Sequence, residues 1–415
     1  IYEYDGAAVT DGSVTIEGIS AIHQGNGIWR ITTSKSSVQA VTYDSISCSG
    51  NTYGITAVNM NGKSVTVIWD RLEVYGYGVS DSRVNVGDSV TIWVKLRYDY
   101  DDVIFDDTKG NVNIGGVSAS WDSVNARWYI TQSKTTVQKV DYGSPSSFTD
   151  NTYGLTAITG TVTQSVIWDR IRTTWYGVSD SRCDVGSSQQ VRVKLELEYD
   201  GHVLGSGDTV YINGTAATYD AANGWFYISH TENTVTKKVF AVTSASEATY
   251  GITAFTETQT LPSIIWDRVD VTLSVPDTRI DVGSSANIQK SATYAYDGTA
   301  FGGTITLNDT ETKDVVGRYG YKVSSISDPN YGLTSFTTNE VFVIFDKVQL
   351  TISTPDDRVD VGSTATVYVT GTYAYDGGTW SGTYSLNDTL TKSTVGKYGY
   401  TVTSITDDNL SLIHI

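Results

Sequence analysis

Four short sequence markers recur in the same order along the chain, and this self-similarity constrains the fold more than any other feature. The first marker is an apolar pair followed by an aromatic residue, an aspartate and a basic residue. Its aromatic residues are Trp69, Trp168, Trp266 and Phe345, spaced by 99, 98 and 79 residues. Because small domains commonly hold about 100 residues, the chain is predicted to be a tandem array of domains.

The other three markers keep step with the first. They are an Asp-x-Arg triplet that precedes Val-Gly, a Tyr-Asp-Gly triplet with one Tyr-Asp-Asp variant, and a Tyr-Gly pair. The arginines of the Asp-x-Arg triplet are Arg83, Arg182, Arg279 and Arg358. The Tyr-Asp-Gly triplet or its variant begins at Tyr4, Tyr100, Tyr199, Tyr296 and Tyr375, and the Tyr-Gly pair begins at Tyr53, Tyr153, Tyr250 and Tyr331. This constant order predicts three complete repeats between two partial ones.

The markers also predict where the repeats begin and end. We expect a partial repeat over residues 1–70 that lacks its N-terminal strands, long-type repeats over 71–169 and 170–267, a short-type repeat over 268–346, and a second partial repeat over 347–409. The long repeats contain an added segment that carries Asn223-Gly224 in one case, a two-residue turn signal that predicts an extra hairpin. The short repeats are therefore expected to drop a strand pair or to shorten one sheet edge.

Residues 410–415 break the repeat pattern. A Tyr-Gly pair should follow Asn409, but the sequence reads Leu-Ser-Leu-Ile-His-Ile. This hexapeptide matches the translation of a transposase end sequence used in DNA library preparation. Our hypothesis is that residues 410–415 are non-native adapter read-through on a metagenomic fragment, and a natural divergent tail is the alternative. The codons of the gene at this boundary would decide between them.

Period-two alternation predicts the secondary structure. Apolar residues occupy every second position from Val90 to Tyr98 and from Val191 to Tyr199, which is typical of strands with one face on a core. No stretch combines a sustained helical period with helix caps, so almost no helix is expected. Short strands separated by Gly, Asn and Asp turns predict an all-β fold of tandem Ig-like β-sandwich modules. Since the connections between repeats are very short, we expect an elongated rod.

Composition excludes several classes of partner and site. The chain has 28 Lys and Arg against 46 Asp and Glu, a net charge of −18, so an acidic protein of this kind is not expected to bind nucleic acid. No apolar run is long enough to predict a membrane span. Cys48 and Cys183 lie at non-equivalent places in different repeats, which excludes a disulfide shared by all repeats.

The Val-Gly before a long alternating strand, the Tyr-Asp-Gly hairpin and the recurring junction at Asp169-Arg170 carry a family resemblance over about residues 1–409. The chain resembles the tandem Ig-like repeats of archaeal and bacterial cell-surface proteins, such as adhesin stalks and S-layer-associated proteins. The resemblance implies an extracellular or cell-surface location. It also implies that the modules serve as spacers, or bind surface glycans or other cell-envelope proteins.

Acidic residues recur next to the predicted junctions, and they admit two interpretations. The positions are Asp70, Asp81, Asp169, Asp180, Asp267, Asp277, Asp346 and Asp356. Carboxylates at a junction could bind calcium and stiffen a rod. However, an arginine or lysine recurs beside both sets, and a neighbouring cation favours Asp–Arg ion pairs over a divalent ion. The sequence therefore favours ion pairs; no cofactor is expected, with junction calcium as the alternative.

Other candidate residues are few. Asn213, Asn308 and Asn387 begin Asn-x-Thr sequons, so they are candidate glycosylation sites. Lys290 aligns with a core position, where a lysine would need a partner or would join an isopeptide bond. A register shift or a side chain that reaches out to solvent is the favoured alternative. Trp93 and Trp380 are candidates for stacking on sugars.

Nothing in the sequence predicts catalysis. The histidines do not recur with the repeats, and the chain carries none of the common hydrolase, metalloprotease or P-loop motifs. We therefore expect no catalytic residues and no enzyme activity. The function that these observations favour is a structural or adhesive extracellular stalk of a cell-surface protein. The alternative is a carbohydrate-binding β-sandwich array of a larger secreted enzyme.

Overall fold

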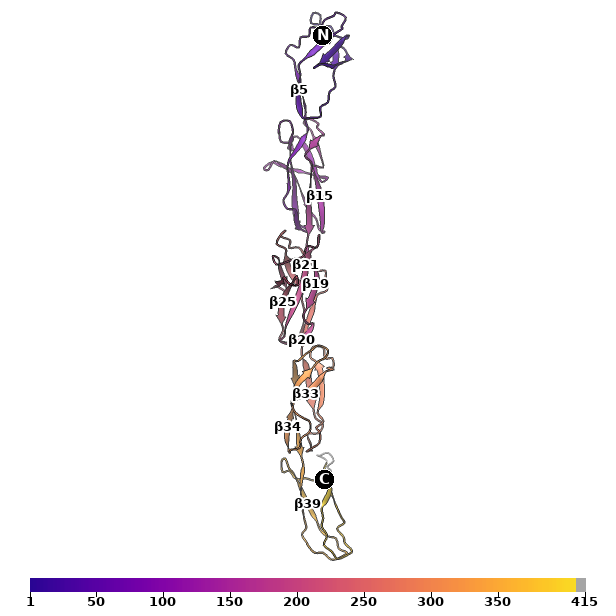
Figure 1. Ribbon diagram of the computed structural model, residues 1–415, viewed down its shortest axis with the longest axis vertical. Helices are drawn as coiled ribbons and strands as arrows, with labels where there is room; N and C mark the ends of the chain where they lie inside the picture. The colour runs from indigo at the N-terminus through magenta and orange to yellow at the C-terminus, as the bar shows by residue number, and fades with distance from the viewer. Residues whose placement is uncertain (408–415) are drawn as a thin grey trace. The chain divides into compact units, whose positions relative to one another are not determined.

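A computed structural model describes residues 1–407, and this part of the chain contains strands and turns but no helix (Figure 1). The contacts divide the chain into two compact units. Unit 1 comprises residues 1–174, 195–210 and 244–258, and unit 2 comprises residues 175–194, 211–243 and 259–415. The hypothesis about residues 410–415 lies outside the described residues, and the repeat boundaries stay a prediction.

Unit 1 contains most of the N-terminal strands. They are β1 (Ser13–Ile16), β2 (Ile19–Ser20), β3 (Ile22–Gly25), β4 (Ile28–Arg30), β5 (Gln39–Tyr43), β6 (Ile46–Ser49), β7 (Val65–Trp69), β8 (Leu72–Val79), β9 (Arg83–Asn85), β10 (Ser89–Tyr98), β11 (Gly110–Ile114), β12 (Val117–Ser118), β13 (Ser120–Asp122), β14 (Arg127–Ser133), β15 (Gln138–Ser144), β16 (Ser147–Asp150), β17 (Ile158–Thr159), β18 (Val162–Asp169) and β28 (Phe255–Thr256). Four more strands contribute residues to both units: β19 (Ile171–Val178), β21 (Ser188–Leu197), β22 (Thr209–Ile212) and β27 (Val242–Ser246).

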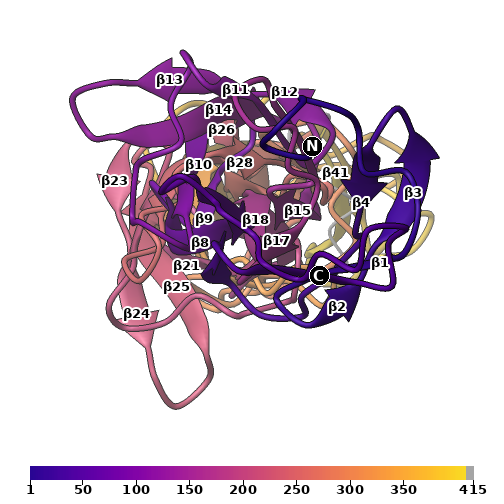
Figure 2. The same cartoon turned by 90° about the horizontal axis from the view of Figure 1, so that it is seen from above.

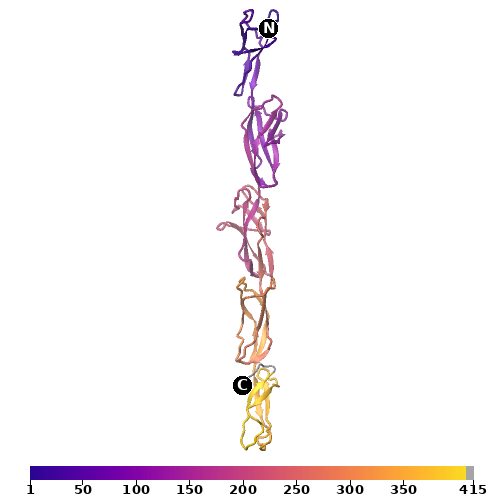
Figure 3. The same ribbon diagram turned by 90° about the vertical axis from the view of Figure 1, so that its right-hand side faces the viewer.

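Unit 2 contains the remaining strands. They are β20 (Arg182–Asp184), β23 (Thr215–Ala216), β24 (Thr218–Asp220), β25 (Trp225–Thr231), β26 (Thr236–Val239), β29 (Ser263–Asp267), β30 (Val269–Ser274), β31 (Arg279–Asp281), β32 (Gln289–Tyr294), β33 (Thr304–Leu307), β34 (Gly317–Tyr321), β35 (Val323–Ser327), β36 (Phe336–Thr338), β37 (Val341–Asp346), β38 (Val348–Ser353), β39 (Tyr368–Tyr373), β40 (Thr383–Leu386) and β41 (Val402–Thr406). Figure 3 draws the part from β30 onward in orange to yellow.

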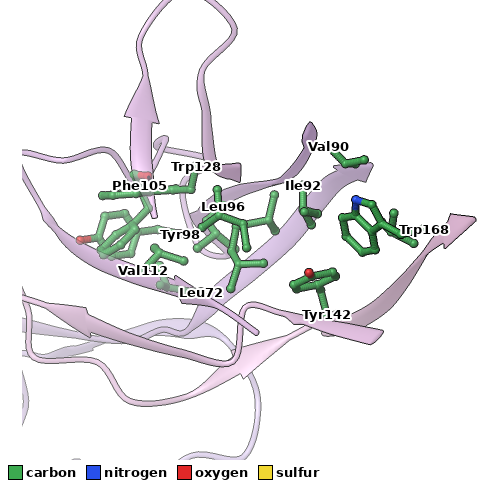
Figure 4. Packing of buried hydrophobic residues seen from close by; sticks show 14 residues of the cluster. Leu72, Val90, Ile92, Leu96, Tyr98, Phe105, Val112, Trp128, Tyr142 and Trp168 are labelled. Carbon is green, nitrogen blue, oxygen red and sulfur yellow. Dashed lines mark hydrogen bonds between the residues drawn. The ribbon is translucent and has the colours of Figure 1, made fainter. Parts of the chain in front are cut away.

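Residues 72–169 of unit 1 form a β-sandwich. One sheet has the strand order β13-β14-β10-β8-β17, and it faces two three-stranded sheets, β15-β18-β9 and β12-β11-β16. The inward side chains of all three sheets meet in one apolar cluster, in which Trp168, Tyr142 and Val112 approach the residues of β10 (Figure 4). The alternation predicted for β10 is confirmed, since every second residue from Val90 to Tyr98 is buried.

Residues 268–346 of unit 2 build a smaller version of this sandwich. Their first sheet keeps only β32-β30-β36, opposite β31-β37-β34 and β33-β35. The pair β13–β14 of the larger version has no counterpart here, so the short repeat drops a strand pair. As a result β32 is the terminal strand of its sheet.

The lost strand pair explains why Lys290 reaches solvent from a position whose equivalents in the long repeats are buried. In the larger sandwich the equivalent Val94 lies beside Trp128 of β14, which covers it. Without that neighbour the side chain of Lys290 reaches solvent, and its Nζ lies 3.1 Å from Glu311 Oε1. An inward-pointing lysine at a sheet edge also opposes edge-to-edge pairing.

The extra hairpin predicted around Asn223-Gly224 is present. Strands β24 and β25 form it in unit 2, and it is drawn at the lower left of Figure 2. However, Asp220 pairs directly with Trp225, so the loop contains four residues and not two. The carboxylate of Asp220 accepts hydrogen bonds from the backbone of Ala222 and the side chain of Asn223, which stabilises this longer turn.

Candidate functional site at the repeat junctions

The junction that follows β18 is organised around a buried arginine. Strand β9 runs parallel to the end of β18 and pairs Arg83 with Ile167. Arg83 is only 4% exposed. Its Nε donates to Asp169 Oδ2 at 2.9 Å, and its Nη1 donates to Asp200 Oδ2 at 2.8 Å. One guanidinium therefore joins the last strand of one repeat to the Tyr-Asp-Gly hairpin of the next.

Two tyrosines complete this cluster. The guanidinium carbon of Arg83 lies 4.7 Å from the ring centroid of Tyr250 and 5.9 Å from that of Tyr199. A cation close to an aromatic face is attracted by the ring quadrupole, most strongly where water is excluded. Glu247 positions Tyr250 by accepting its backbone N–H at 2.8 Å.

The carboxylate of Asp169 uses both of its oxygens. While Oδ2 binds Arg83, Oδ1 accepts the backbone N–H groups of Arg170 at 2.8 Å and Tyr199 at 3.0 Å. Asp169 is fully buried, and a buried carboxylate needs this complete set of partners. It ties the end of β18 to the Tyr-Asp-Gly hairpin of the next repeat.

A third contact crosses the same junction. Asn85, two residues after Arg83, accepts the backbone N–H groups of Thr253 and Ala254 at 2.7 Å each. These two residues precede β28, which pairs with the beginning of β19. The end of β9 thereby holds two separate segments of the following repeat.

Unit 2 repeats the arrangement around Arg182. Its Nε donates to Asp267 at 3.0 Å and its Nη1 to Asp297 at 2.9 Å, while Tyr294 and Tyr331 lie 4.6 and 4.4 Å from the guanidinium. Asp184 takes the place of Asn85 and accepts the N–H groups of Thr334 and Ser335, each at 2.8 Å.

A third copy surrounds Arg279. Its Nε lies 3.3 Å from Asp346 Oδ2, it also pairs with Asp376, and it lies 4.6 Å from the ring of Tyr373. The sequence markers thus supply the arginine and both aspartates of every cluster, although they lie far apart in the sequence. They also supply Tyr199, Tyr250 and Tyr331, whereas Tyr294 and Tyr373 lie two residues before a Tyr-Asp-Gly marker. We call each such cluster an arginine junction.

The charges of each arginine junction stabilise one another. Burial alone would lower the pKa of Arg83, but the hydrogen bonds to Asp200 and Asp169 outweigh it and raise that pKa. The same balance raises the pKa of Arg182. In return, the hydrogen bond from Arg83 lowers the pKa of Asp200 to about 2, and that from Arg182 lowers the pKa of Asp297.

The structure separates the eight aspartates that were candidate calcium ligands. Asp169, Asp267 and Asp346 are buried against arginines. Asp81 and Asp180 are exposed and accept the backbone N–H of Arg83 and Arg182, and Asp277 and Asp356 are exposed at the equivalent places. Asp70 accepts the backbone N–H groups of Arg71 and Tyr100.

These aspartates do not gather into a metal-binding cluster. Within residues 1–407, no group of three or more His, Cys, Asp or Glu side chains is placed to hold a metal ion. The side chains of Arg170 and Arg268, each directly after a buried aspartate, pair with Glu198 and Asp270 instead. The partner of Asp169 is Arg83, from the other end of the same repeat.

The three sequon asparagines share one hydrogen-bonding role. Asn308 Oδ1 accepts the backbone N–H of Lys322 at 2.8 Å, and its Nδ2 donates to Gly320 O at 3.1 Å. Asn213 likewise accepts the backbone N–H of Ala241 and donates to the carbonyl of Val239. Asn387 accepts the N–H of Thr401 and donates to the carbonyl of Gly399. Each side chain therefore bridges to a neighbouring segment of the backbone. Whether any of them carries a glycan stays a prediction.

One of the two candidate sugar-stacking tryptophans is excluded by its burial. Trp380 packs with Tyr373 and Ile405 in an apolar cluster. Trp93 is half-buried on the outward face of β10, with the Arg127 guanidinium 5.5 Å from its ring. The absence of catalytic residues stays a prediction.

Sequence reasoning missed the tyrosines and Asn85 as junction residues. Tyr250 and Tyr331 belong to the Tyr-Gly marker, whose constant place in the repeat was the available signal. Asn85 lies two residues after the marker arginine, where the later repeats carry Asp184 and Asp281. A polar residue recurring at this position could have identified the contact.

Comparison with known proteins gives matches only among solved structures, since no family model and no curated protein matches the chain. The adhesin FdeC of Escherichia coli is 12% identical over 66% of this chain and 96% of its own, with a TM-score of 0.25. Invasin, a bacterial integrin-binding protein, is 12% identical over 88% of this chain and 77% of its own, with a TM-score of 0.24. An I-band fragment of titin is 10% identical over 64% and 98%, with a TM-score of 0.26.

The sheets and cores described above define the class: this is an all-β protein of tandem Ig-like β-sandwich modules. Bacterial adhesins are among the solved structures that it resembles. At these identities and TM-scores, the likeness says nothing about a ligand. No helix in the described part of the chain is long and apolar enough to cross a membrane.

Proposed function

We propose that the chain is a structural or adhesive stalk segment of a cell-surface protein, in which arginine junctions hold consecutive Ig-like modules in a fixed direction. The observation that carries this proposal is the repetition of one cluster in which Arg83, Arg182 and Arg279 each pair with a buried aspartate. A flexible linker would not require buried ion pairs, whereas a spacer that must project a binding surface gains from stiff connections. Surface glycans or other cell-envelope proteins are the proposed partners, outside the cell.

Small-angle X-ray scattering tests the stalk function. The native chain should scatter as an extended particle of defined length. Replacing Arg83, Arg182 and Arg279 together by serine should allow bending at the junctions and shorten the maximum dimension. A matched control replaces Arg71, Arg170 and Arg268, which are partly exposed, and keeps the same net charge. A compact native particle, or equal changes in both triple variants, would contradict the proposal.

A second candidate function, carbohydrate binding, is favoured by one hollow in unit 1. Trp121, Asp122, Arg127 and Tyr129 are among the residues that line it, and its volume is about 310 Å³. A small hollow lined by convergent polar groups suits the hydroxyl groups of a sugar. Binding of the native chain on a glycan array, lost in Tyr129→Ala, would support this function; a silent array would leave the stalk.

A further inference from the structure

One sheet of unit 2 carries two adjacent tryptophans on its outward face. Strands β25, β21 and β19 are neighbours in this order, and the side chains of β21 and β25 alternate between the core and the outward face. Trp225 of β25 and Trp175 of β19 have ring centroids 5.7 Å apart and ring planes 24° from parallel. Since Trp175 is 39% exposed, part of this aromatic surface is open to solvent.

A glycine lets one of the two indoles lie close to the sheet. A Cβ atom at Gly177 would overlap the six-membered ring of Trp175. Glycine inside a strand marks a place where another group approaches the backbone closely, and here that group is the ring two residues earlier in the same strand. The indole is thereby held against the sheet before any ligand arrives, which lowers the entropic cost of binding.

Two cations lie beside the other indole. The guanidinium carbon of Arg192 is 5.2 Å and the Nζ of Lys194 is 5.7 Å from the ring centroid of Trp225. Gln190 Oε1 accepts hydrogen bonds from Nε and Nη2 of Arg192 at 3.2 and 2.9 Å. This neutral partner orients the guanidinium without cancelling its charge, and Arg192 forms no ion pair within residues 1–407. We call Trp175, Trp225, Arg192 and Lys194 the tryptophan face.

The tryptophan face is positive although the whole chain has a net charge of −18. At physiological ionic strength the Debye length is about 8 Å, so charges further away than this are largely screened. The carboxylate of Asp220, whose charge interacts with Arg192, is occupied by hydrogen bonds from Ala222 and Asn223. The local charge that a ligand meets is therefore that of the two cations.

The first long repeat has a related but different face. Trp93 of β10 is equivalent to Arg192. Arg127 of β14 is equivalent to Trp225, and its guanidinium lies 5.5 Å from the Trp93 ring. The contact between a cation and an aromatic ring is thus kept, although its two members exchange strands. Trp175 has a glycine as its equivalent, so the second long repeat adds a tryptophan to a contact that both long repeats share.

We propose that the tryptophan face binds an acidic glycan. The face of an indole is electron-rich, and the C–H groups of a pyranose ring carry a slight positive charge, so the sugar stacks on Trp175. The carboxylate or sulfate group of the sugar pairs with Arg192 and Lys194. A run of acidic side chains would match the cations but would leave the indoles uncovered. The proposal rests on the stalk function in one respect, since it names which of the proposed surface glycans this module binds.

Fluorescence anisotropy with two labelled probes, a galacturonic acid hexasaccharide and a sulfated heparin hexasaccharide, tests the proposal on the native 415-residue chain. We expect saturable binding of at least one probe, with one site per chain. Trp175→Ala should weaken this binding at least about tenfold, because it removes the exposed stacking surface. Tyr211→Ala is the matched control, at a residue 41% exposed on the other sheet of the sandwich, and should leave affinity unchanged. Binding of neither probe, or equal losses in the two variants, would overturn the proposal.

Two further measurements separate charge from stacking. The methyl ester of the galacturonic acid hexasaccharide keeps the sugar rings but lacks the negative charge, so it should bind the native chain more weakly. Arg192→Gln should narrow the difference between acid and ester, which is the signature of a direct pair, and an unchanged difference would contradict it. Hexaglutamate carries negative charge without sugar rings and should not displace the hexasaccharide. Full displacement would assign the face to an acidic peptide and overturn the proposal.

Scattering keeps this proposal distinct from the stalk function. Trp175 belongs to no arginine junction, so Trp175→Ala should keep the maximum dimension of the native particle while it loses glycan binding. A native chain that scatters as an extended particle but binds neither hexasaccharide would overturn the glycan site and leave the stalk function intact.

Discussion

Arg83 and Asp169 are 86 residues apart in the sequence, yet the Nε of the arginine donates to the carboxylate at 2.9 Å and both side chains are buried. The pair closes one Ig-like repeat by joining β9 to the end of β18. Through Asp200 the same guanidinium reaches the next repeat. An ion pair that closes one repeat is therefore also a connection to the next repeat.

Removing the arginine should destabilise the end of β18. Arg83→Ser leaves Asp169 buried without its cation, and a broken buried pair typically costs about 3–5 kcal/mol. Arg170→Ser breaks a partly exposed pair with Glu198, which should cost at most about 1 kcal/mol. Hydrogen exchange of the β18 amides measures the free energy of local opening in the intact chain. Equal effects of the two variants would refute the structural role of the buried pair.

Acidification should release the contact between Arg83 and Asp200. The hydrogen bond from Arg83 lowers the pKa of Asp200 from 3.8 to about 2. The folded state therefore binds this proton less readily than the unfolded state, and the pair stabilises the fold fully above the ordinary pKa. Its contribution should decline as the pH falls toward about 2. Asp200→Asn should remove this part of the pH dependence of hydrogen exchange. Asp101→Asn should not, because the carboxylate of Asp101 pairs with no arginine within residues 1–407.

Asp281 should have the opposite pH dependence. Burial and the charges of Asp407 and Asp346 raise its pKa from 3.8 to about 6. Because the folded state favours the protonated carboxyl, stability is greatest at low pH and falls as the pH rises through about 6. Asp281→Asn should therefore raise the unfolding temperature of this region at neutral pH and have little effect at about pH 4. Scanning calorimetry at both pH values is the test, and a destabilised variant at neutral pH would contradict it.

The sequon asparagines should matter to stability through their hydrogen bonds. Asn308→Ala removes the bonds to Lys322 and Gly320 and should cost about 1–2 kcal/mol. Thr310→Ala destroys the same sequon but leaves both bonds intact, so it should cost less. Chemical denaturation of the unglycosylated chain compares the two variants. If both lose equal stability, the hydrogen bonds are not the reason.

Much of the architecture follows from local pattern. Alternation between Val90 and Tyr98 places one face of β10 in a core, because successive side chains of a strand point to opposite faces. The spacing of the markers likewise anticipates recurring modules and the lost hairpin of the short repeat. The burial of Trp380 and the exposure of Lys290 cannot be predicted from local alternation, because each depends on which strand lies alongside.

The sequence by itself determined that this protein is all-β, repetitive and acidic, and that certain Asp, Arg and Tyr residues recur in step. Only the tertiary structure decided that these markers form one cluster, with Arg83 bound to Asp169 and Asp200. The physical reason is that periodicity fixes the face of a strand locally. A side-chain contact across 86 residues, by contrast, is set by the register of distant strands and by how one sandwich closes on the next.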